Sequence, residues 1–318
     1  MQVTAKFIFE LPFPILMQGE YGSRSHQITE EIVVYAPAVE GPPWSEEPQW
    51  EPEAKHFRGI SNGQPTWVAR YIIMDIKRDY SSIPITGEDQ KALVAKAREI
   101  LHKMLTLYRW QERQLQLDVK NIEQVDYRLW YYDVAGNLID AGPSGIQKTG
   151  AVHLTVTFPA RKVDRWNDIC QHLASGTMPE LYESLILDAY SIVNQEPRRA
   201  VLDTATACEV FIEKFCEATS KNNPEVDAVV IKALTTGAGV LDYFHQVLKY
   251  LCKHSLKEEK EDLYQELDYL VRTNNFVKHE GLCGYNNKKG RFVDVDSKRA
   301  KEFIGAVEET IRHTKSLN

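Results

Sequence analysis

The stretch LVRTNNFVKHEG, residues 270–281, decides how the C-terminal half of the chain is interpreted. We expect it to form the end of a helix, because Gly281 supplies the left-handed residue that commonly follows the last helical turn. Arg272 and His279 are seven residues apart, about two turns, so their side chains lie on one helical face with Asn275 between them. That face carries a fixed cation, an amide and a titratable imidazole.

Two interpretations of this face are open. A guanidinium that holds a phosphate, beside an imidazole that carries a proton near neutral pH, is the minimum equipment for cleaving RNA without a metal. Alternatively, Arg272 and His279 simply interact with the last carbonyl groups of the helix and face water. The spacing alone favours the second interpretation, so the rest of the chain has to decide between them.

The composition is that of a globular protein without a surplus of positive charge. The 318 residues suggest two domains, and the hydrophobic fraction of 43% and charged fraction of 26% exclude a fibrous or disordered chain. The net charge of −7 is not that of a dedicated nucleic-acid-binding protein. An RNA site in this chain must therefore be a local basic patch.

Cysteine and histidine usage argues against a metal site or a disulfide framework. The five cysteines form no CxxC pair, and the histidines away from the helix end form no HxxxH or HExxH pair. We therefore expect reduced thiols and neither a metal nor a cofactor. No apolar run approaches the roughly 18 residues of a membrane span. The expectation is a cytoplasmic protein with no membrane partner.

The N-terminal half shows the pattern of an α+β domain. Alternating and β-branched segments predict strands at residues 3–11, 28–35, 67–77, 126–134 and 152–158. A helix over residues 86–117 is expected to place an apolar stripe against the sheet. Residues 37–65 carry repeated prolines and glutamates and predict a long acidic loop. The fold class is therefore α+β, with a mixed sheet and one long helix in a domain spanning residues 1–160.

The C-terminal half, residues 161–318, shows helical periodicity instead. Helices are expected over residues 163–174, 179–193, 197–222, 231–253, 257–280 and 297–314. Pro197 opens the third of them at the first helical position, and Ser297 is expected to cap the last. These helices predict an all-α bundle with short connections.

Three blocks in this half resemble the HEPN superfamily. They are the helix containing Tyr182 and residues 185–189, the run from Arg198 through Glu209, and the Arg272-x6-His279-Glu-Gly281 motif. The resemblance covers about residues 180–315. It implies an all-α, usually dimeric domain, and many members are metal-independent ribonucleases in phage defence, toxin and RNA-processing systems. The spacing is the longest that the family signature allows, and Thr273 follows the arginine where the family commonly has another polar residue.

Further residues are candidates for supporting roles around the motif. Related proteins often carry an acidic residue near the arginine, and Glu209 is the candidate here, expected to pair with Arg272 if it is buried and to face solvent otherwise. Asn274 is a less favoured substitute for Asn275. The basic residues expected to form a phosphate patch beside the motif are Lys278, Lys288, Lys289 and Arg291.

Two functions follow as hypotheses. The first is a metal-independent endoribonuclease of the HEPN type, acting as a homodimer on RNA, with Arg272, Asn275 and His279 as catalytic residues and a role in phage defence or as a toxin. Its N-terminal domain would sense a trigger or bind a protein partner. The second is a non-catalytic HEPN-like module that dimerises and binds a nucleotide or a protein. The acidic net charge of the chain and the presence of Thr273 after the arginine favour the second hypothesis. The guanidinium of Arg272 and the imidazole of His279 on one helical face favour the first.

Overall fold

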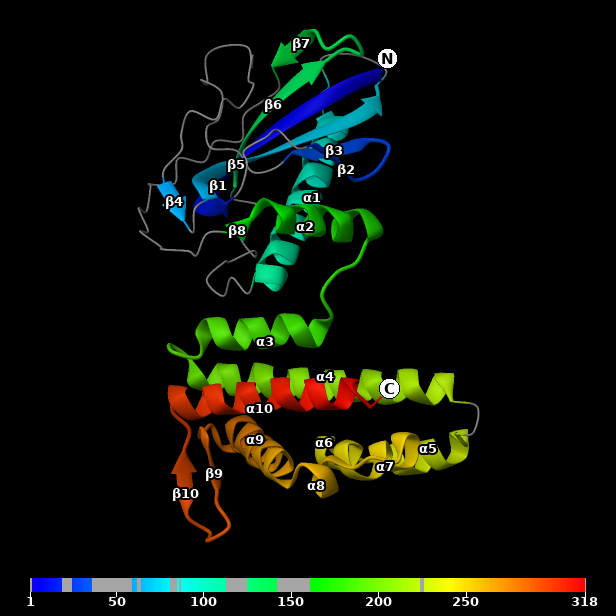
Figure 1. Ribbon diagram of the computed structural model, residues 1–318, viewed down its shortest axis with the longest axis vertical. Helices are drawn as coiled ribbons and strands as arrows, with labels where there is room; N and C mark the ends of the chain where they lie inside the picture. The colour runs from blue at the N-terminus through cyan, green and yellow to red at the C-terminus, as the bar shows by residue number, and fades with distance from the viewer. Residues whose placement is uncertain are drawn as a thin grey trace. The chain divides into compact units, whose positions relative to one another are not determined.

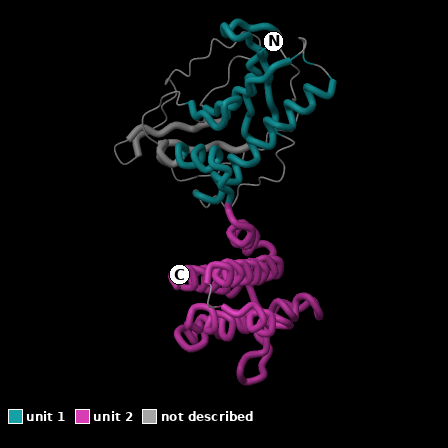
Figure 2. The backbone as a smooth tube through the Cα atoms, turned by 90° about the vertical axis from the view of Figure 1, so that its right-hand side faces the viewer, with its two compact units in different colours: residues 1–112, 117–178 teal, residues 113–116, 179–318 magenta. Residues whose placement is uncertain are grey.

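The computed structural model describes residues 2–18, 25–35, 59–61, 64–80, 85, 87–112, 125–141, 161–223 and 226–317. The chain divides into two compact units, the first ending at Met178 and the second beginning at Pro179 (Figures 1 and 2). This boundary lies later in the chain than the expected division at residue 160. The fold class is α+β, as predicted, with a sheet in the first unit and a helix-rich second unit.

The first unit is built on a largely antiparallel sheet with the strand order β2-β3-β5-β1-β6-β7. The central strand β1 pairs antiparallel with β5 on one side and β6 on the other. Two short strands join the sheet beside this path, with β4 on β5 and β8 parallel to β1. The bounds are β1 Gln2–Gln18, β2 Ser25–Gln27, β3 Ile32–Tyr35, β4 Gly59–Ser61, β5 Gln64–Asp79, β6 Asp126–Tyr132, β7 Leu138–Ala141 and β8 Arg161–Lys162.

The prolines of β1 interrupt its pairing but do not end the strand. The sequence predicted a stop at residue 11, yet β1 continues to Gln18. Its register against β5 shifts between Glu10 and Ile15, the interval that contains Pro12 and Pro14. Proline has no N–H to donate to a neighbouring strand, so the ladder breaks there and resumes on the far side.

Other predicted strands differ in detail. Residues 28–35 hold a turn followed by β3, and Ile28 N donates to Ile32 O to close that turn. The predicted acidic loop overlaps β4 and the first residues of β5. The predicted strand at residues 152–158 and Thr86, the first residue of the predicted helix over 86–117, lie outside the described residues.

Two helices supply the other layer of the first unit: α1, Gly87–Glu112, and α2, Val163–Ser175 (Figure 1). The predicted apolar stripe of α1 is buried, from Leu93 and Ala97 to Met104 and Leu107. It packs with alternate residues of β1, β3, β5 and β6 in one core. Trp166 of α2 is buried in the same core. The sequence had placed α2 in the second domain, but its buried face belongs to the first unit.

The second unit is a helical bundle with a small hairpin. Its long helices are α3 Leu181–Ile192, α4 Pro197–Asn222, α9 Glu261–Glu280 and α10 Ser297–Lys315. Shorter segments join α4 to α9, namely α5 Ala228–Thr235, α6 Val240–Asp242, the π-helical turn η2 Tyr243–Val247, α7 Leu248–Cys252 and α8 Leu256–Glu259. The hairpin between α9 and α10 consists of β9 Gly284–Asn286 and β10 Phe292–Asp294. One core of side chains from all the long helices holds the unit together.

Backbone breaks divide two helices that the sequence predicted to be continuous. The expected helix over 231–253 is interrupted after α5, where Gly237 has φ +74°. The expected helix over 257–280 is divided at Lys260, whose φ of −140° and ψ of 62° are not helical. Asp296, rather than Ser297, caps α10, because its side chain accepts a hydrogen bond from the backbone N–H of Arg299.

Candidate functional site on helix α9

The end of α9 has the geometry that the sequence predicted. Gly281 follows the last turn with φ 72° and ψ 7°. This is the left-handed backbone conformation, which residues other than glycine rarely adopt. His279 lies in that last turn and is exposed. Arg272 and Asn275 are also exposed, whereas the intervening Thr273 is fully buried. The three predicted catalytic residues therefore share the solvent face of α9.

Arg272 is held by a carboxylate of its own helix. Its Nε lies 3.0 Å from Oδ1 of Asp268, and its Nη2 lies 2.9 Å from Oδ2. The contact is bidentate, the geometry that best fixes the plane of a guanidinium. The side chain of Arg272 remains 50% exposed, so it stays accessible from solvent. Asp268 orients the arginine and also competes with any anion that approaches it.

Glu209 does not have the role considered for it. It is exposed on α4, and the carboxylate that pairs with Arg272 is that of Asp268. An exposed glutamate does not need a buried cation to compensate it, so the reason for expecting the pair disappears. The pairing residue was readable from the sequence, because Asp268 and Arg272 stand at the i,i+4 spacing of a helical ion pair.

The two asparagines have different environments. Asn275 faces solvent, which suits a residue that contacts a substrate. Asn274 is 9% exposed, and its Oδ1 finds no hydrogen-bond partner among the described residues. Thr273 uses its hydroxyl within the helix, donating to the carbonyl of Tyr269 at 2.7 Å. On the buried side of α9 the hydroxyl of Thr273 is therefore satisfied within the helix, whereas the amide oxygen of Asn274 has no partner among the described residues.

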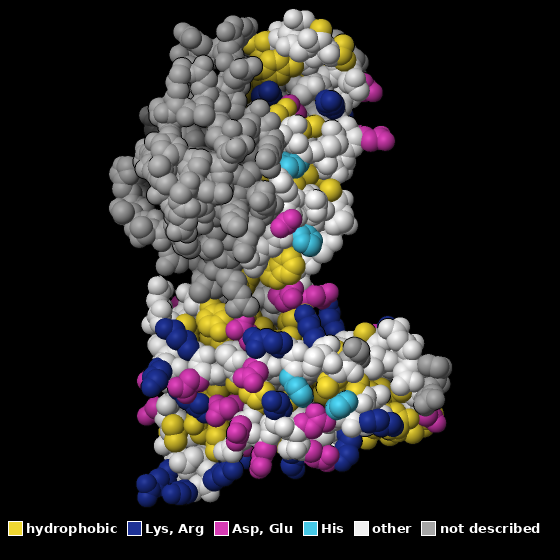
Figure 3. Space-filling view, in the orientation of Figure 1, with side chains coloured by type: hydrophobic (Ala, Val, Ile, Leu, Met, Phe, Trp, Pro, Cys, Tyr) yellow, Lys and Arg dark blue, Asp and Glu magenta, His cyan; other side chains and the backbone are white. Residues whose placement is uncertain are grey.

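The predicted basic patch is divided. Lys278 is exposed beside His279, but Lys288, Lys289 and Arg291 lie in the turn between β9 and β10. Figure 3 shows Lys and Arg side chains gathered at that end of the second unit. The hairpin runs back along α9, because Tyr285 stacks on Tyr269 with ring centroids 4.4 Å apart. Nζ of Lys288 then reaches Oε1 of Gln265 at 2.9 Å. Gln265 precedes His279 by about 20 Å of helix, so the lysines do not adjoin the imidazole as predicted.

A second arginine lies at the end of α9. A Cβ atom on Gly281 would stand 3.5 Å from Nη2 of Arg198, which belongs to the first turn of α4. This guanidinium approaches the segment that follows His279, where the last carbonyls of the helix concentrate negative partial charge. In the sequence, Arg198 is notable only as part of the resemblance to the HEPN superfamily. Its approach depends on how α4 packs on α9, and no local pattern predicts that.

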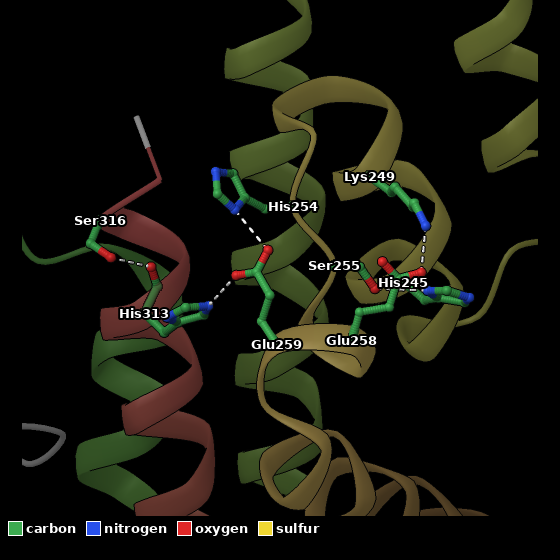
Figure 4. Close-up of polar contacts among 8 residues, drawn as sticks. All are labelled: His245, Lys249, His254, Ser255, Glu258, Glu259, His313 and Ser316. Carbon is green, nitrogen blue, oxygen red and sulfur yellow. Dashed lines mark hydrogen bonds and ion pairs between the residues drawn. The ribbon is translucent and has the colours of Figure 1, made fainter.

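A separate histidine cluster lies among α8, α10 and the connection before α8 (Figure 4). His254 Nδ1 lies 2.7 Å from Oε1 of Glu259, and His313 Nε2 lies 3.5 Å from the other carboxylate oxygen. The hydrogen bond with His254 is the main cause that lowers the pKa of Glu259. A carboxylate between two imidazoles repels phosphate, so this cluster ties segments together and is not a second RNA site. His245 in turn contacts Ser255, which is buried.

Within the part of the chain that the structure covers, no three His, Cys, Asp or Glu side chains are arranged to hold a metal ion. None of the helices in that same part has the length and apolar character needed to span a lipid bilayer. Comparison with protein-family models, with curated proteins and with solved structures finds no match to this chain. The candidate site therefore rests on its own residues and their geometry.

Proposed function

We propose that this protein is a metal-independent endoribonuclease of the HEPN type, with its active site on the exposed face of α9. The observation that carries the proposal is the common exposure of Arg272, Asn275 and His279 on one face, with the arginine already oriented by Asp268. An arginine held in this way differs from the freely moving one expected at a merely solvated helix end.

The roles follow from the chemistry of strand cleavage by a 2′-hydroxyl group. The reaction needs a base to remove the hydroxyl proton, an acid for the leaving 5′ oxygen, and donors for the charge that develops on the phosphorus oxygens. His279 serves in proton transfer, because the ordinary pKa of histidine lies near neutral pH. Arg272 stabilises the charge, and Asn275 orients the scissile group.

A homodimer fits this chemistry better than a monomer. The exposed face of α9 presents one imidazole, and one imidazole is poorly suited to both proton transfers. Two copies of the motif across a shared cleft would supply an acid and a base. The proposal therefore includes RNA as substrate and a second copy of the chain as partner, and it needs neither a metal nor a cofactor.

The test is cleavage of RNA by the purified full chain in the presence of EDTA. The His279→Ala variant is expected to lose activity by about a hundredfold to ten-thousandfold, the usual contribution of a general acid or base. The matched control is His102→Ala, which removes an exposed histidine from α1 of the first unit and should leave cleavage unchanged. Full activity in the His279→Ala variant would overturn the assignment.

One observation favours the nucleotide-binding form of the alternative, a non-catalytic HEPN-like dimerisation module that binds a nucleotide, here one within an RNA strand, without cleaving it. Asp268 already occupies two donors of Arg272, which weakens the positive field available to a transition state. In that case wild-type protein binds RNA, Arg272→Ala weakens the binding, and no cleavage is detected with or without His279. The same assay thus separates the two functions.

A role in phage defence or as a toxin, a cytoplasmic location, and a trigger or protein partner for the first unit belong to the same proposal. They follow from the HEPN resemblance in the second unit. The first unit has a separate core, which suits a sensing domain joined to an effector domain.

A further inference from the structure

Two phenylalanines pair on the surface of the second unit instead of in its core. The ring centroids of Phe276, on α9, and Phe292, on β10, lie 5.6 Å apart with their planes at 81°, an edge-to-face contact. Phe292 is 42% exposed, and the neighbouring Leu282 is 50% exposed. Among the described residues, neither ring belongs to the hydrophobic core of the unit. The pair therefore needs an explanation other than core packing.

Phe276 shares the helical face of the proposed catalytic residues. It follows Arg272 by four residues, which places it about 40° around the helix, and His279 lies about 20° to the other side. Phe276 and His279 are three residues apart, so they are neighbours on the helix surface. Phe292, the first residue of β10, pairs with Asn286 beside the hairpin turn and brings a second aromatic ring to the flank of the site, while Lys288 of the turn reaches Gln265.

The ring of Phe292 is fixed in place while one side stays open to water. It packs over Gly284 of the adjacent strand so closely that a Cβ atom there would come within 2.4 Å of the ring carbon Cζ. Phe276 supports the same ring edge-on. An exposed aromatic ring that is already ordered loses little conformational freedom when a partner stacks on it.

The charges around the pair match an anionic partner that carries aromatic groups. Arg272 is exposed on α9 four residues before Phe276, and Arg291 is exposed directly before Phe292. The exposed carboxylate of Glu280 stands four residues after Phe276, so it lies on the other side of that ring from Arg272 and disfavours phosphate there. A phosphate held at Arg272 therefore brings the adjoining base beside Phe276. Cations beside open aromatic rings are the combination that binds single-stranded nucleic acid.

We propose that Phe276 and Phe292 form a stacking platform for a nucleobase next to the phosphate that Arg272 holds, so that the substrate is single-stranded RNA. This inference rests on the proposed function. A base in a double helix is already stacked and does not present its face to a protein ring, whereas an unpaired base does. The platform contacts the base by its π-face, so it should select strandedness more strongly than sequence.

The experiment measures binding of a fluorescently labelled single-stranded RNA to the full chain carrying His279→Ala, which prevents cleavage. In that background Phe292→Leu is expected to weaken binding by about tenfold, and Phe292→Tyr, which keeps the ring, by less than about twofold. The matched control is Val229→Ala on α5, which trims another exposed apolar side chain of the same unit and should have no effect. A series of RNAs, each with one abasic nucleotide at a different position, should include one to which Phe292→Leu and its parent bind equally well. That position is the base that stacks on the ring.

The outcomes separate the platform from the nuclease. If Phe292→Leu leaves RNA affinity unchanged, the platform is wrong even when His279→Ala abolishes cleavage. If Phe292→Leu instead converts a dimer to a monomer in sedimentation, with equal loss for every abasic RNA, the patch is an interface between two copies and the proposal is overturned. If wild-type protein neither binds nor cleaves RNA, the platform and the proposed function fail together.

Discussion

The carboxyl group of Asp75 is buried in the sheet of the first unit. Tyr35 donates a hydrogen bond of 2.7 Å to Oδ2, and Nζ of Lys6 lies 3.8 Å from Oδ1. Burial raises the pKa of Asp75 above its ordinary value, and Lys6 and Tyr35 only partly oppose this. The folded state therefore holds the proton more tightly than the unfolded state. The resulting stabilisation is present below about pH 4 and is lost as the pH rises through the folded-state pKa.

The substitution Asp75→Asn should remove this pH dependence, because an amide does not ionise. The free energy of unfolding of the variant, relative to wild type, should increase between about pH 4 and pH 7. Tryptophan fluorescence measures it in the first unit alone, since all six tryptophans precede residue 179. Asp133→Asn is the control, because the pKa of Asp133 is shifted in the opposite direction to that of Asp75. Hydrogen bonds from Asn137 and Ala135 lower the pKa of Asp133, so its contribution is lost as the pH falls. A pH-independent difference for Asp75→Asn would contradict the argument.

At the scale of elements, Arg299 of α10 joins two helices and the hairpin. Its Nη2 lies 2.7 Å from Oε2 of Glu266 on α9, and its Nη1 lies 2.9 Å from Glu302. The guanidinium stands 4.5 Å from the ring centroid of Phe303 and 5.6 Å from that of Tyr285 on β9. These contacts hold β9 against α9 and so position the hairpin that carries Phe292.

Arg299→Leu is expected to destabilise the second unit by about 2 kcal/mol, through lost cation–π contact and an unpaired, half-buried Glu266. Arg299→Lys keeps the charge but lacks the planar guanidinium, so its free energy of unfolding should lie between that of Arg299→Leu and that of wild type. Far-ultraviolet circular dichroism follows the helices during unfolding, and tryptophan fluorescence should not change. Arg312→Ala, which removes an exposed arginine of the same helix, is the control. A loss below about 0.5 kcal/mol for Arg299→Leu would show that the hairpin is held by other contacts.

At the scale of the whole molecule, two units with separate cores carry a net charge of −7. Only a few local cations contact RNA in such a chain, so its affinity should fall only shallowly with added salt. The ribonuclease activity proposed for the second unit predicts an effect on cell growth, because cleavage of host RNA slows growth.

Expression of the full chain in bacteria should therefore slow growth, and Arg272→Ala should restore it. Removing the guanidinium takes away the group that holds the phosphate, so cleavage is lost while the fold remains. Growth rate at matched protein levels is the measurement, with Arg312→Ala as the arginine control. Equal growth of wild type and Arg272→Ala would count against a nuclease.

The features that the sequence predicted correctly are those set by nearby residues. The apolar stripe of α1 and the helix end at Gly281 follow from spacing and backbone conformation within a few residues. The exposure of His279 and Asn275 with Arg272 follows from helical periodicity. The pair between Asp268 and Arg272 obeys the same rule, although it was not recognised in advance.

The features that it did not predict depend on residues distant along the chain. Helix α2 joins the first unit because Trp166 packs with α1 and the sheet, which its own periodicity does not reveal. The position of Lys288 depends on the hairpin running back along α9. Glu209 is exposed because the bundle buries the other face of α4. The sequence did not determine whether Glu209 lies on the buried or the exposed face.

The hairpin that returns along α9 also bears on how the second unit folds. From Glu261 to Lys315 the chain forms a helix, a hairpin and a helix, and the contacts of these three elements with one another join residues closer in sequence than their contacts with α4 do. Structures dominated by short loop closures fold rapidly, because little chain entropy is lost before the first contacts form. This segment should therefore assemble early in refolding, before α3 and α4 complete the bundle. Arg272 and His279 would then take their relative positions early, and the approach of Arg198 on α4 would be a late event.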